Sequence, residues 1–427
     1  MLRCHRYLVT IDITTSTPGP AHGSDRARRR GLIALCLTEI TSWGALYYAF
    51  PVLLGAITVD TGWSTMTVMG AFSVGLAVSA IAGIPVGQLL DRLGPRPVMT
   101  TGSVIGVLSV VAIAMAPTPG WFIAAWAVSG VAQACVFYKP AFAAITGWYG
   151  PTRVKALTAL TLVAGLSSTI FAPLTAAIAD RTDWRTTYLI LATVLAVITV
   201  PTHAVFLNVP WRRTDEHRAN TEQPKRRLRK IMRSRAFICL VSAMAMASFG
   251  MFAATVNLVP LVTEQGASTS FAAWALGLCG AGQLLGRVGY GRLANATTTR
   301  VRTVAVLAAA AVTIAITAAT AAPTITLIAA AVAFGATRGI LTLLEATAVS
   351  DRWGTDGFGA LYGAFSAPST IAMATTPWIG AILTGWVGGY QVLFVYLAGI
   401  VALAAVLGFF SVSRSGHSSG DSSATNA

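Results

Sequence analysis

Long apolar stretches separated by short polar connectors follow one another along almost the whole chain. Each stretch is long enough, at about 20 residues, to cross a hydrocarbon core of roughly 30 Å as a helix. The twelve stretches begin near Gly31, Thr65, Pro97, Trp121, Ala156, Trp184, Ala236, Phe271, Val301, Thr324, Gly357 and Tyr390. The pattern predicts an all-α integral membrane protein with twelve transmembrane helices.

The composition agrees with a chain that lies mostly in lipid. Of the 427 residues, 55% are hydrophobic and only 11% are charged, and the mean hydropathy is +0.68. A soluble chain of this length needs far more charge on its surface, so this class is excluded. The cysteines have no paired spacing for a disulfide framework or zinc, and we expect no metal and no cofactor.

Basic residues gather in alternate connectors between the apolar stretches. The richer set of connectors holds Arg26 to Arg30, Arg92, Arg96, Arg153, Lys155, Arg212 to Arg235, Arg292 to Arg302, Arg352 and Arg414. The opposite connectors hold only Arg181 and Arg185. By the positive-inside rule, the richer set faces the cytoplasm together with both termini. The net charge of +15 therefore reflects topology, and we expect contact with a lipid bilayer and no nucleic-acid partner.

A polar, basic segment divides the chain into two halves. We expect a cytoplasmic tail at 1–30, a six-helix bundle at 31–209, a cytoplasmic linker at 210–235, a second six-helix bundle at 236–412 and a cytoplasmic tail at 413–427. The first tail lacks the layout of a cleavable signal peptide. The linker could also bind anionic lipid or nucleic acid, but a positive-inside linker explains its charge more simply.

The two halves match each other at an offset of about 204 to 206 residues. The matched sites are Gly87–Asp91 with Gly291–Asn295, Ser42–Gly44 with Ser248–Gly250, Pro173 with Pro377, and Trp184 with Tyr390. Four sites in the same order predict a parallel repeat of six helices, related by an axis along the membrane normal.

A charged turn lies between the second and third apolar stretches. Residues 87–96 read GQLLDRLGPR, and a weaker copy at 286–295 reads GRVGYGRLAN. The turn and its copy resemble the signature that follows the second helix in the major facilitator superfamily. This resemblance covers about Gly31 to Val412. It implies the facilitator fold, with a substrate path between the halves that is lined by helices 1, 4, 7 and 10.

By the same resemblance, the acid of the turn latches the second helix to the other half. Asp91 can pair with Arg96 or with a helix N-terminus, each worth on the order of 1 kcal/mol. Gly87 allows helices to approach closely, and Gly94 permits the tight turn. Asn295 replaces the acid in the copy, so the latch is asymmetric. A merely topogenic turn would not predict a copy. The expected gating residues are Gly87, Asp91, Arg92, Gly94, Arg96 and Arg287.

Four ionisable residues lie inside apolar stretches, on helices that the resemblance places around the cavity. Burial at membrane depth costs at least about 2.5 to 3.5 kcal/mol for each, which marks them as functional candidates. Glu39 and Lys139 have similar depths, and we expect an exchangeable pair that couples protons; the alternative is that Lys139 snorkels to the interface. Arg338 is the expected anchor for a substrate carboxylate. Glu345 is either a second proton site or a rim charge.

Aromatic and polar residues accompany these charges. Trp43, Tyr47 and Phe50 fall at helical spacing on the Glu39 side of the first helix, and Tyr138 precedes Lys139. They predict an aromatic cavity wall, although aromatics on membrane helices also pack against neighbouring helices. Trp43, Tyr47 and Asn257 join Lys139 and Arg338 as the expected substrate-binding residues.

The segment from Trp43 to Leu54, followed by Thr61-Gly-Trp-Ser64, is similar to the prokaryotic monocarboxylate and oxalate/formate porter branch. The arginine that drug exporters carry in helix 4 is Trp126 here, and their Gly-Pro pair in helix 5 is Ala172-Pro173. The sequence has no phosphate-binding loop and no soluble catalytic domain that would indicate an enzyme. We therefore expect a monomeric, proton-coupled transporter of a small organic solute, such as a carboxylate, in a bacterial cell membrane. The alternative is an exporter of drugs or secondary metabolites.

Overall fold

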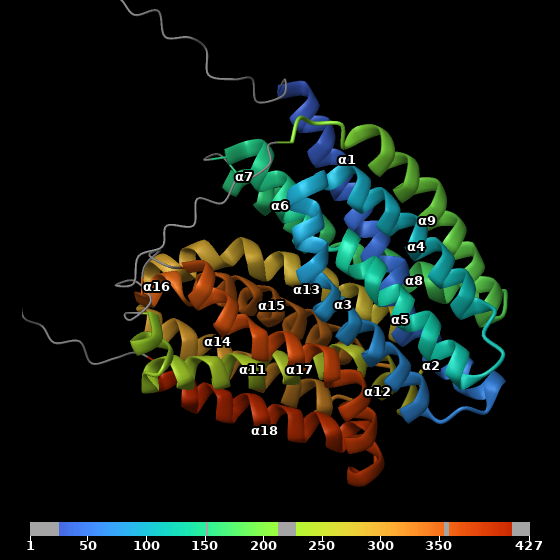
Figure 1. Ribbon diagram of the computed structural model, residues 1–427. Helices are drawn as coiled ribbons and strands as arrows, with labels where there is room; N and C mark the ends of the chain where they lie inside the picture. Colours follow the sequence, from blue (N-terminus) through green and yellow to red (C-terminus); the bar gives the residue numbers. More distant parts are fainter. Residues whose placement is uncertain (1–24, 151–152, 212–227, 354–357, 412–427) are drawn as a thin grey trace, which may run out of the picture.

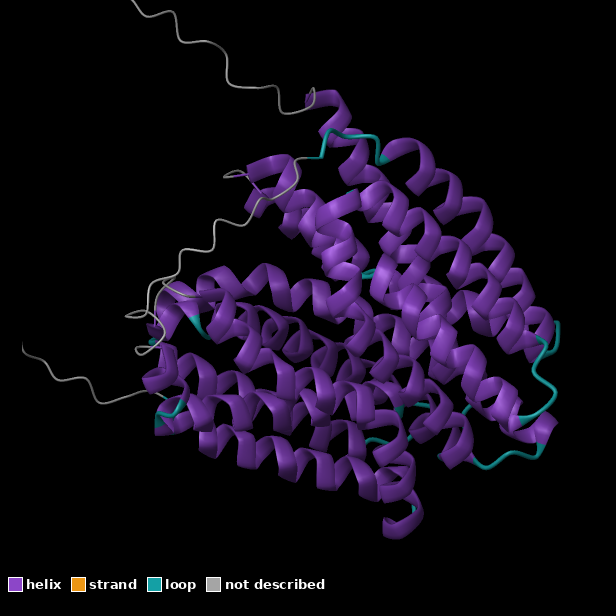
Figure 2. Cartoon of the chain, viewed as in Figure 1, coloured by secondary structure: helices purple, strands orange, loops and turns teal. Residues whose placement is uncertain are grey.

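The computed structural model describes residues 25–150, 153–211, 228–353 and 358–411, and this part of the chain contains helices and connectors but no strand (Figures 1 and 2). Helices satisfy every backbone hydrogen bond within one segment, which lipid requires. Eleven of them are long and apolar enough to cross a membrane. The all-α membrane fold is thereby confirmed.

The first half contains six membrane-crossing units. Their helices are α1 (Asp25–Trp43), η1 (Gly44–Tyr48) and α2 (Ala49–Thr61); α3 (Thr65–Leu93); α4 (Pro95–Ala114); α5 (Pro119–Val136) and α6 (Tyr138–Tyr149); α7 (Arg153–Ala164) and α8 (Ser167–Ala179); and α9 (Trp184–Phe206). α1 begins at Asp25, six residues before the apolar stretch, because a helix continues through the flanking arginines.

The second half repeats this order. Its helices are α11 (Arg235–Val256) and α12 (Leu258–Glu264); α13 (Thr269–Ala296); α14 (Thr299–Ala319); α15 (Ile325–Thr347); the short α16 (Ser350–Trp353); α17 (Phe358–Val387); and α18 (Tyr390–Phe409). α13 has 28 residues but does not count among the eleven apolar helices, because Arg287, Arg292 and several glycines lower its hydropathy.

Side-chain caps set where many helices begin. The capping oxygens belong to Ser64, Thr118, Asp183, Ser234, Ser268, Thr298 and Thr324, and each accepts a hydrogen bond from the amide three residues later. At Asp183, which lies outside the spans, these bonds from Thr186 hold the pKa of the carboxyl below its usual value.

Close glycine crossings give the two halves the same internal packing. A Cβ at Gly130 of α5 would lie 2.1 Å from the Gly75 carbonyl oxygen of α3, and one at Gly335 of α15 would lie 1.9 Å from the Cys279 carbonyl oxygen of α13. Gly130 and Gly335 are 205 residues apart, which is the offset of the sequence repeat. The structure therefore contains the repeat at the level of backbone contacts.

The repeat also appears where α9 and α18, the last long helix of each half, begin. The Trp184 indole donates a hydrogen bond of 2.8 Å to Asp60 at the end of α2, and the Tyr390 amide donates one of 2.9 Å to Glu264 at the end of α12. In each half, an acid at the end of one helix thus holds the start of another.

The two bundles meet along one end of the molecule and separate toward the other (Figure 1). We call the end where α1 begins and α18 finishes the terminal end, and the opposite end, with the connectors at Gly62 and Gly266, the far end. Toward the far end, the Trp378 amide of α17 donates a 2.9 Å hydrogen bond to Ser73 of α3, and Gly277 of α13 lies against Pro173 of α8. These contacts join the halves.

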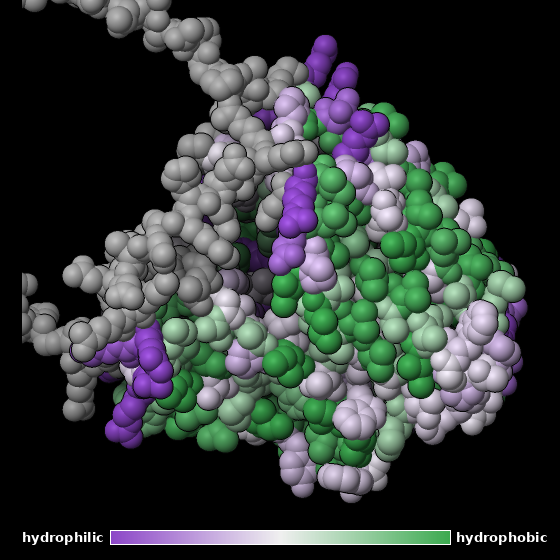
Figure 3. Space-filling model, viewed as in Figure 1, coloured by the Kyte–Doolittle hydropathy of each residue, from purple (hydrophilic) through white to green (hydrophobic). Residues whose placement is uncertain are grey.

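The outer surface is largely apolar. Hydrophobic side chains cover much of the visible flank of each half, and the most hydrophilic side chains lie mainly toward the terminal end (Figure 3). Large apolar side chains such as Ile81, Val197 and Val395 are more than half exposed on these flanks. An apolar flank between more polar ends suits a protein whose sides contact lipid.

The charged turn lies at the terminal end, between α3 and α4. Gly94 has φ +82°, which confirms that the turn needs a glycine. The close helix approach expected at Gly87 is not present in this conformation: no atom of the described residues lies within 4 Å of a Cβ built there, because the halves are separated at this end. The Arg96 side chain donates to the Ala204 carbonyl at 2.7 Å and so ties the turn to α9. The side chain of Asp91 lies outside the described residues.

Candidate functional site

A cavity of about 290 Å³ lies between the two halves, from the middle of the helices toward the terminal end. The first half contributes α1, η1, α3, α5, α6 and α7, and the second half contributes α11, α13, α15 and α17. Several of these crossings are interrupted at the depth of the cavity, at η1, at Phe137 between α5 and α6, and at Asn257 between α11 and α12. Backbone of this kind is tolerated in a membrane where protein or a cavity surrounds it.

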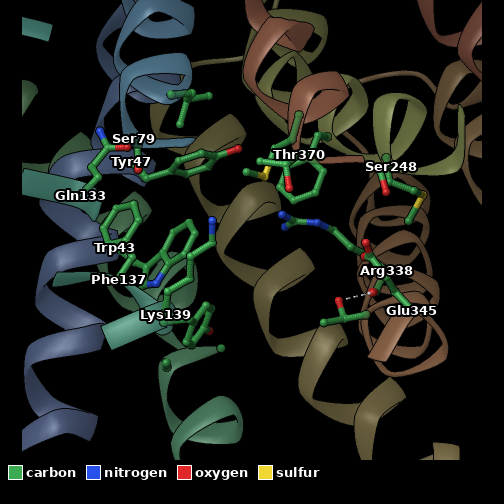
Figure 4. A pocket seen from close by; sticks show the side chains of 18 of the residues that line it. Trp43, Tyr47, Ser79, Gln133, Phe137, Lys139, Ser248, Arg338, Glu345 and Thr370 are labelled. Carbon is green, nitrogen blue, oxygen red and sulfur yellow. Dashed lines mark hydrogen bonds between the residues drawn. The ribbon is translucent and has the colours of Figure 1, made fainter. Parts of the chain in front are cut away.

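Arg338 enters the cavity from α15. Its side chain is buried, its guanidinium carbon lies 4.8 Å from the centre of the Phe252 ring, and its Nη1 atom has no hydrogen-bond partner. Within the described residues no carboxylate forms an ion pair with it. Figure 4 shows the side chain pointing across the cavity toward the first half. A buried cation with an unused donor is suited to bind an anion.

Glycines fix the position of Arg338. A Cβ at the adjacent Gly339 would lie 2.1 Å from the Gln283 carbonyl oxygen of α13, and one at Gly286 would lie 2.0 Å from the Ala336 carbonyl oxygen. The backbones of α13 and α15 therefore touch on both sides of the arginine. Such contact fixes the backbone that carries Arg338 relative to α13.

Lys139 enters the cavity from the opposite half. It lies in the first turn of α6, directly after the interruption at Phe137, and its Nζ atom would lie 3.4 Å from a Cβ at Gly83 of α3. Figure 4 shows the amine near Trp43, pointing toward the middle of the cavity and toward Arg338. The structure thus brings two cations of the predicted site together, one from each half.

The expected pair between Glu39 and Lys139 is absent: among the described residues, neither side chain belongs to an ion pair. Glu39 is fully buried and does not line the cavity. Its Oε2 atom accepts a 3.0 Å hydrogen bond from the Trp43 indole, while Oε1 has no partner. Trp43 therefore stands between the carboxyl and the cavity.

Glu345 and Arg287 also line the cavity, nearer its terminal end. Glu345 lies two turns after Arg338 on α15 and is partly buried. Arg287 of α13 donates a hydrogen bond to the Thr161 carbonyl of α7, so it links the two halves. Glu345 is the only carboxylate among the described cavity residues.

Some of the expected aromatic wall is present. Trp43 lines the cavity and stacks on Phe137 with ring centres 4.0 Å apart and planes 10° apart. Tyr47 also lines it, and its buried hydroxyl has no hydrogen-bond partner. Phe50 does not line it, because its ring stacks on Phe72 in the core. Asn257 is also outside the wall: its amide donates to the Ala253 carbonyl at 2.9 Å, where α11 ends.

Sequence reasoning missed several polar residues of the wall. They are Ser79, Gln133, Ser248, Gln283, Thr342 and Thr370. The sequence repeat could have identified Gln133, because this residue precedes Arg338 by 205 residues and so occupies the same position in the first repeat. Its Nε2 atom lies 3.4 Å from the Leu46 carbonyl, and its Oε1 atom has no partner.

The fold and the cavity together define a membrane transporter built from two helical repeats. A family model for the Major Facilitator Superfamily matches residues 35–316 and 238–427, and the chain belongs to this family of transporters, which are not enzymes. Multiple passes through a membrane follow from that membership.

Named relatives are transporters as well. The chain is 26% identical over 391 residues to "Monocarboxylate transporter 13" of Rattus norvegicus, which covers 88% of this chain and 87% of the relative. It is 26% identical over 215 residues to "Fujikurins efflux protein" of Gibberella fujikuroi. This match covers 48% of this chain and 43% of the relative.

Solved structures agree on the fold. A bacterial homologue of the human lysosomal transporter Spinster, in an inward-facing, unoccupied conformation, matches with a TM-score of 0.72 at 15% identity over 91% of this chain and 98% of that one. A point mutant of the nucleoside transporter NupG matches with a TM-score of 0.66 at 13% identity over 90% and 98%.

Proposed function

We propose that this protein is a secondary active transporter of a small organic carboxylate, and that it works by rocking its two halves about the cavity. The observation that carries the proposal is the unpaired Arg338, buried between the halves with a free donor and facing Lys139. Two cations that form no ion pair within the described residues favour an anionic occupant, because burying charge without a partner is costly. The monocarboxylate transporter among the relatives supports the same substrate class.

Each proposed site residue has a part in this cycle. Arg338 and Lys139 bind the carboxylate from opposite halves, and Tyr47 and Trp43 form the wall beside it. Arg287 links α13 to α7 in the cavity wall, and this bond must change when the halves rock, while the turn with Asp91, Arg92, Gly94 and Arg96 acts at the terminal end. Asn257 has no contact with the cavity, and we leave it out of the site.

Proton coupling is assigned to the two carboxyls of the region. Glu345 lies in the cavity wall, where a proton and a substrate can both reach it. Glu39 lies behind Trp43 and becomes accessible only when that indole moves. A carboxyl that is hidden in one conformation and open in another is a means to couple protons to a conformational change.

The membrane arrangement follows the distribution of charge. We propose that α13 is the twelfth span, because it is long enough and occupies the repeat position of α3. The terminal end carries most of the basic residues, so it faces the cytoplasm by the positive-inside rule. The cavity then opens inward. We place the protein as a monomer in the plasma membrane of a bacterium.

Counterflow in proteoliposomes tests the substrate class. We expect wild-type protein to exchange carboxylates and Arg338→Ala to lose at least 10-fold of that flux, since a charge-assisted hydrogen bond to a carboxylate is worth about 1.5 to 3 kcal/mol. Arg292→Ala, an exposed base at the terminal end, is the control and keeps its activity. Undiminished carboxylate exchange in Arg338→Ala would contradict the anchor assignment.

Export of drugs or secondary metabolites is the second candidate, and the efflux protein among the relatives favours it. Movement of cationic drugs alone, with no carboxylate exchange in the same vesicles, would support this candidate. Loss of the arginine would then leave the flux unchanged, because a cation gains nothing from Arg338.

A further inference from the structure

We infer that the transported carboxylate carries an aromatic ring, an inference that rests on the proposed function and narrows its substrate class. The cavity wall combines unpaired cations with an unusual share of aromatic side chains. The aromatic members are Trp43, Tyr47, Tyr48, Phe137, Tyr138 and Phe252. A small aliphatic acid cannot stack on these aromatic side chains, whereas a planar ring can.

The aromatic side chains and the arginine lie on opposite sides of the cavity. Trp43 and Phe137 form a parallel stack on the side of the first half, and Figure 4 shows them facing the space into which Arg338 points from the second half. A molecule with a carboxylate at one end and a ring at the other therefore touches both halves at once. Its binding favours the approach of the halves, which is what a transport cycle needs.

The volume of the cavity agrees with an occupant of this size. Its volume of about 290 Å³ is about ten times the roughly 30 Å³ that one water molecule takes in the liquid, which leaves room for a ring beside the carboxylate. A two- or three-carbon acid would leave much of this space empty. Besides the polar residues named above, aliphatic side chains and the two methionines Met251 and Met373 line the wall, and methionine packs well against ring edges.

Trp43 is the residue that we expect to recognise the ring. It is partly exposed, while Tyr47 beside it is almost fully buried. The Trp43 ring is held by Phe137 on one side and by its hydrogen bond to Glu39, so it is already oriented before a ligand arrives. An ordered aromatic surface loses little side-chain entropy on binding.

Counterflow with three matched acids tests the inference. Phenylacetate, cyclohexylacetate and lactate all carry one carboxylate at neutral pH, and only the first has an aromatic ring. We expect wild-type protein to exchange phenylacetate about 5-fold faster than cyclohexylacetate, as a stacking contact of about 1 kcal/mol predicts, and lactate more slowly still. Equal or faster exchange of cyclohexylacetate or lactate would overturn the inference.

Variants of Trp43 test whether this residue causes the preference for phenylacetate over cyclohexylacetate. Trp43→Leu should bring the phenylacetate to cyclohexylacetate ratio close to one, while Trp43→Phe, which keeps an aromatic ring but loses the indole N–H and part of the ring area, should stay well above one. Phe409→Leu, a half-exposed aromatic at the end of α18 outside the cavity wall, should behave as wild type. If Trp43→Leu keeps the wild-type ratio, Trp43 is not the recognition surface. Absence of exchange for all three acids would instead contradict the proposed function itself.

Discussion

At the scale of single residues, the buried carboxyl of Glu39 invites a direct test. It receives one hydrogen bond, from Trp43, and has no cation beside it within the described residues. If it carries the coupled proton, Glu39→Gln should abolish accumulation driven by a pH gradient while counterflow at equal pH continues. The two assays on the same vesicles separate loss of coupling from loss of folding.

Glu345 gives the matched comparison for this experiment. It lines the cavity and Glu39 does not, so Glu345→Gln tests the other carboxyl under the same conditions. If gradient-driven accumulation survives Glu39→Gln and fails in Glu345→Gln, the coupling proton belongs to the cavity wall. If both variants accumulate substrate normally, neither carboxyl couples protons.

The hydrophobic pattern of the sequence predicted the depth of the ionisable residues along the helices better than it predicted the direction of their side chains. Lys139, Arg338 and Glu345 line the cavity as expected, but Glu39 and Phe50 do not. Depth follows from counting residues at 1.5 Å each, whereas orientation depends on the rotation of each helix about its axis. In a stretch that is apolar on all sides, no polar face reveals that rotation.

At the scale of elements, the crossing of α13 and α15 is the contact that positions Arg338. Gly339→Ala would place a Cβ 2.1 Å from a carbonyl oxygen of α13, so the two helices must move apart. We expect a fall of several degrees in the melting temperature of the detergent-solubilised protein, and at least a 10-fold loss of exchange.

Gly289→Ala is the control for that change. Gly289 belongs to α13, but nothing lies within 4 Å of a Cβ built there, so the variant should melt and transport as wild type does. A Gly339→Ala protein that is as stable and active as Gly289→Ala would show that the close crossing is not needed.

The all-helical fold and the order of the long helices could be predicted from apolar stretches, and the repeat from matched motifs; the predicted number, twelve, is one more than the eleven apolar spans of the described residues. The glycine crossings were also within reach, since Gly282 with Gly286 and Gly335 with Gly339 each have the four-residue spacing of close helix contacts. The π-helical segment η1 could not be predicted, because it depends on tertiary packing of Gly44 against the Phe171 ring rather than on a local breaker.

At the scale of the whole molecule, the contacts between halves define one state of a rocking cycle. Toward the far end Gly70 and Ser73 of α3 lie against Trp378 of α17, whereas Gly87, at the other end of α3, has no neighbour. In the opposite state, α3 must separate from α17 at the far end and the halves must approach each other near Gly87. Two rigid halves that were in contact at both ends could not exchange substrate.

A disulfide across the closed end should therefore stop transport. In a protein whose five native cysteines are replaced by serine or alanine, the pair Ser73→Cys and Trp378→Cys should cross-link under oxidation, since the Ser73 side-chain oxygen lies 2.9 Å from the Trp378 backbone amide. We expect exchange to fall to background and to return on reduction. The pair Gly106→Cys and Ala132→Cys, whose Cβ atoms are 3.6 Å apart within one half, should cross-link without loss of exchange. If the first pair cross-links fully and transport continues, the halves do not separate at the far end, and the rocking mechanism is wrong.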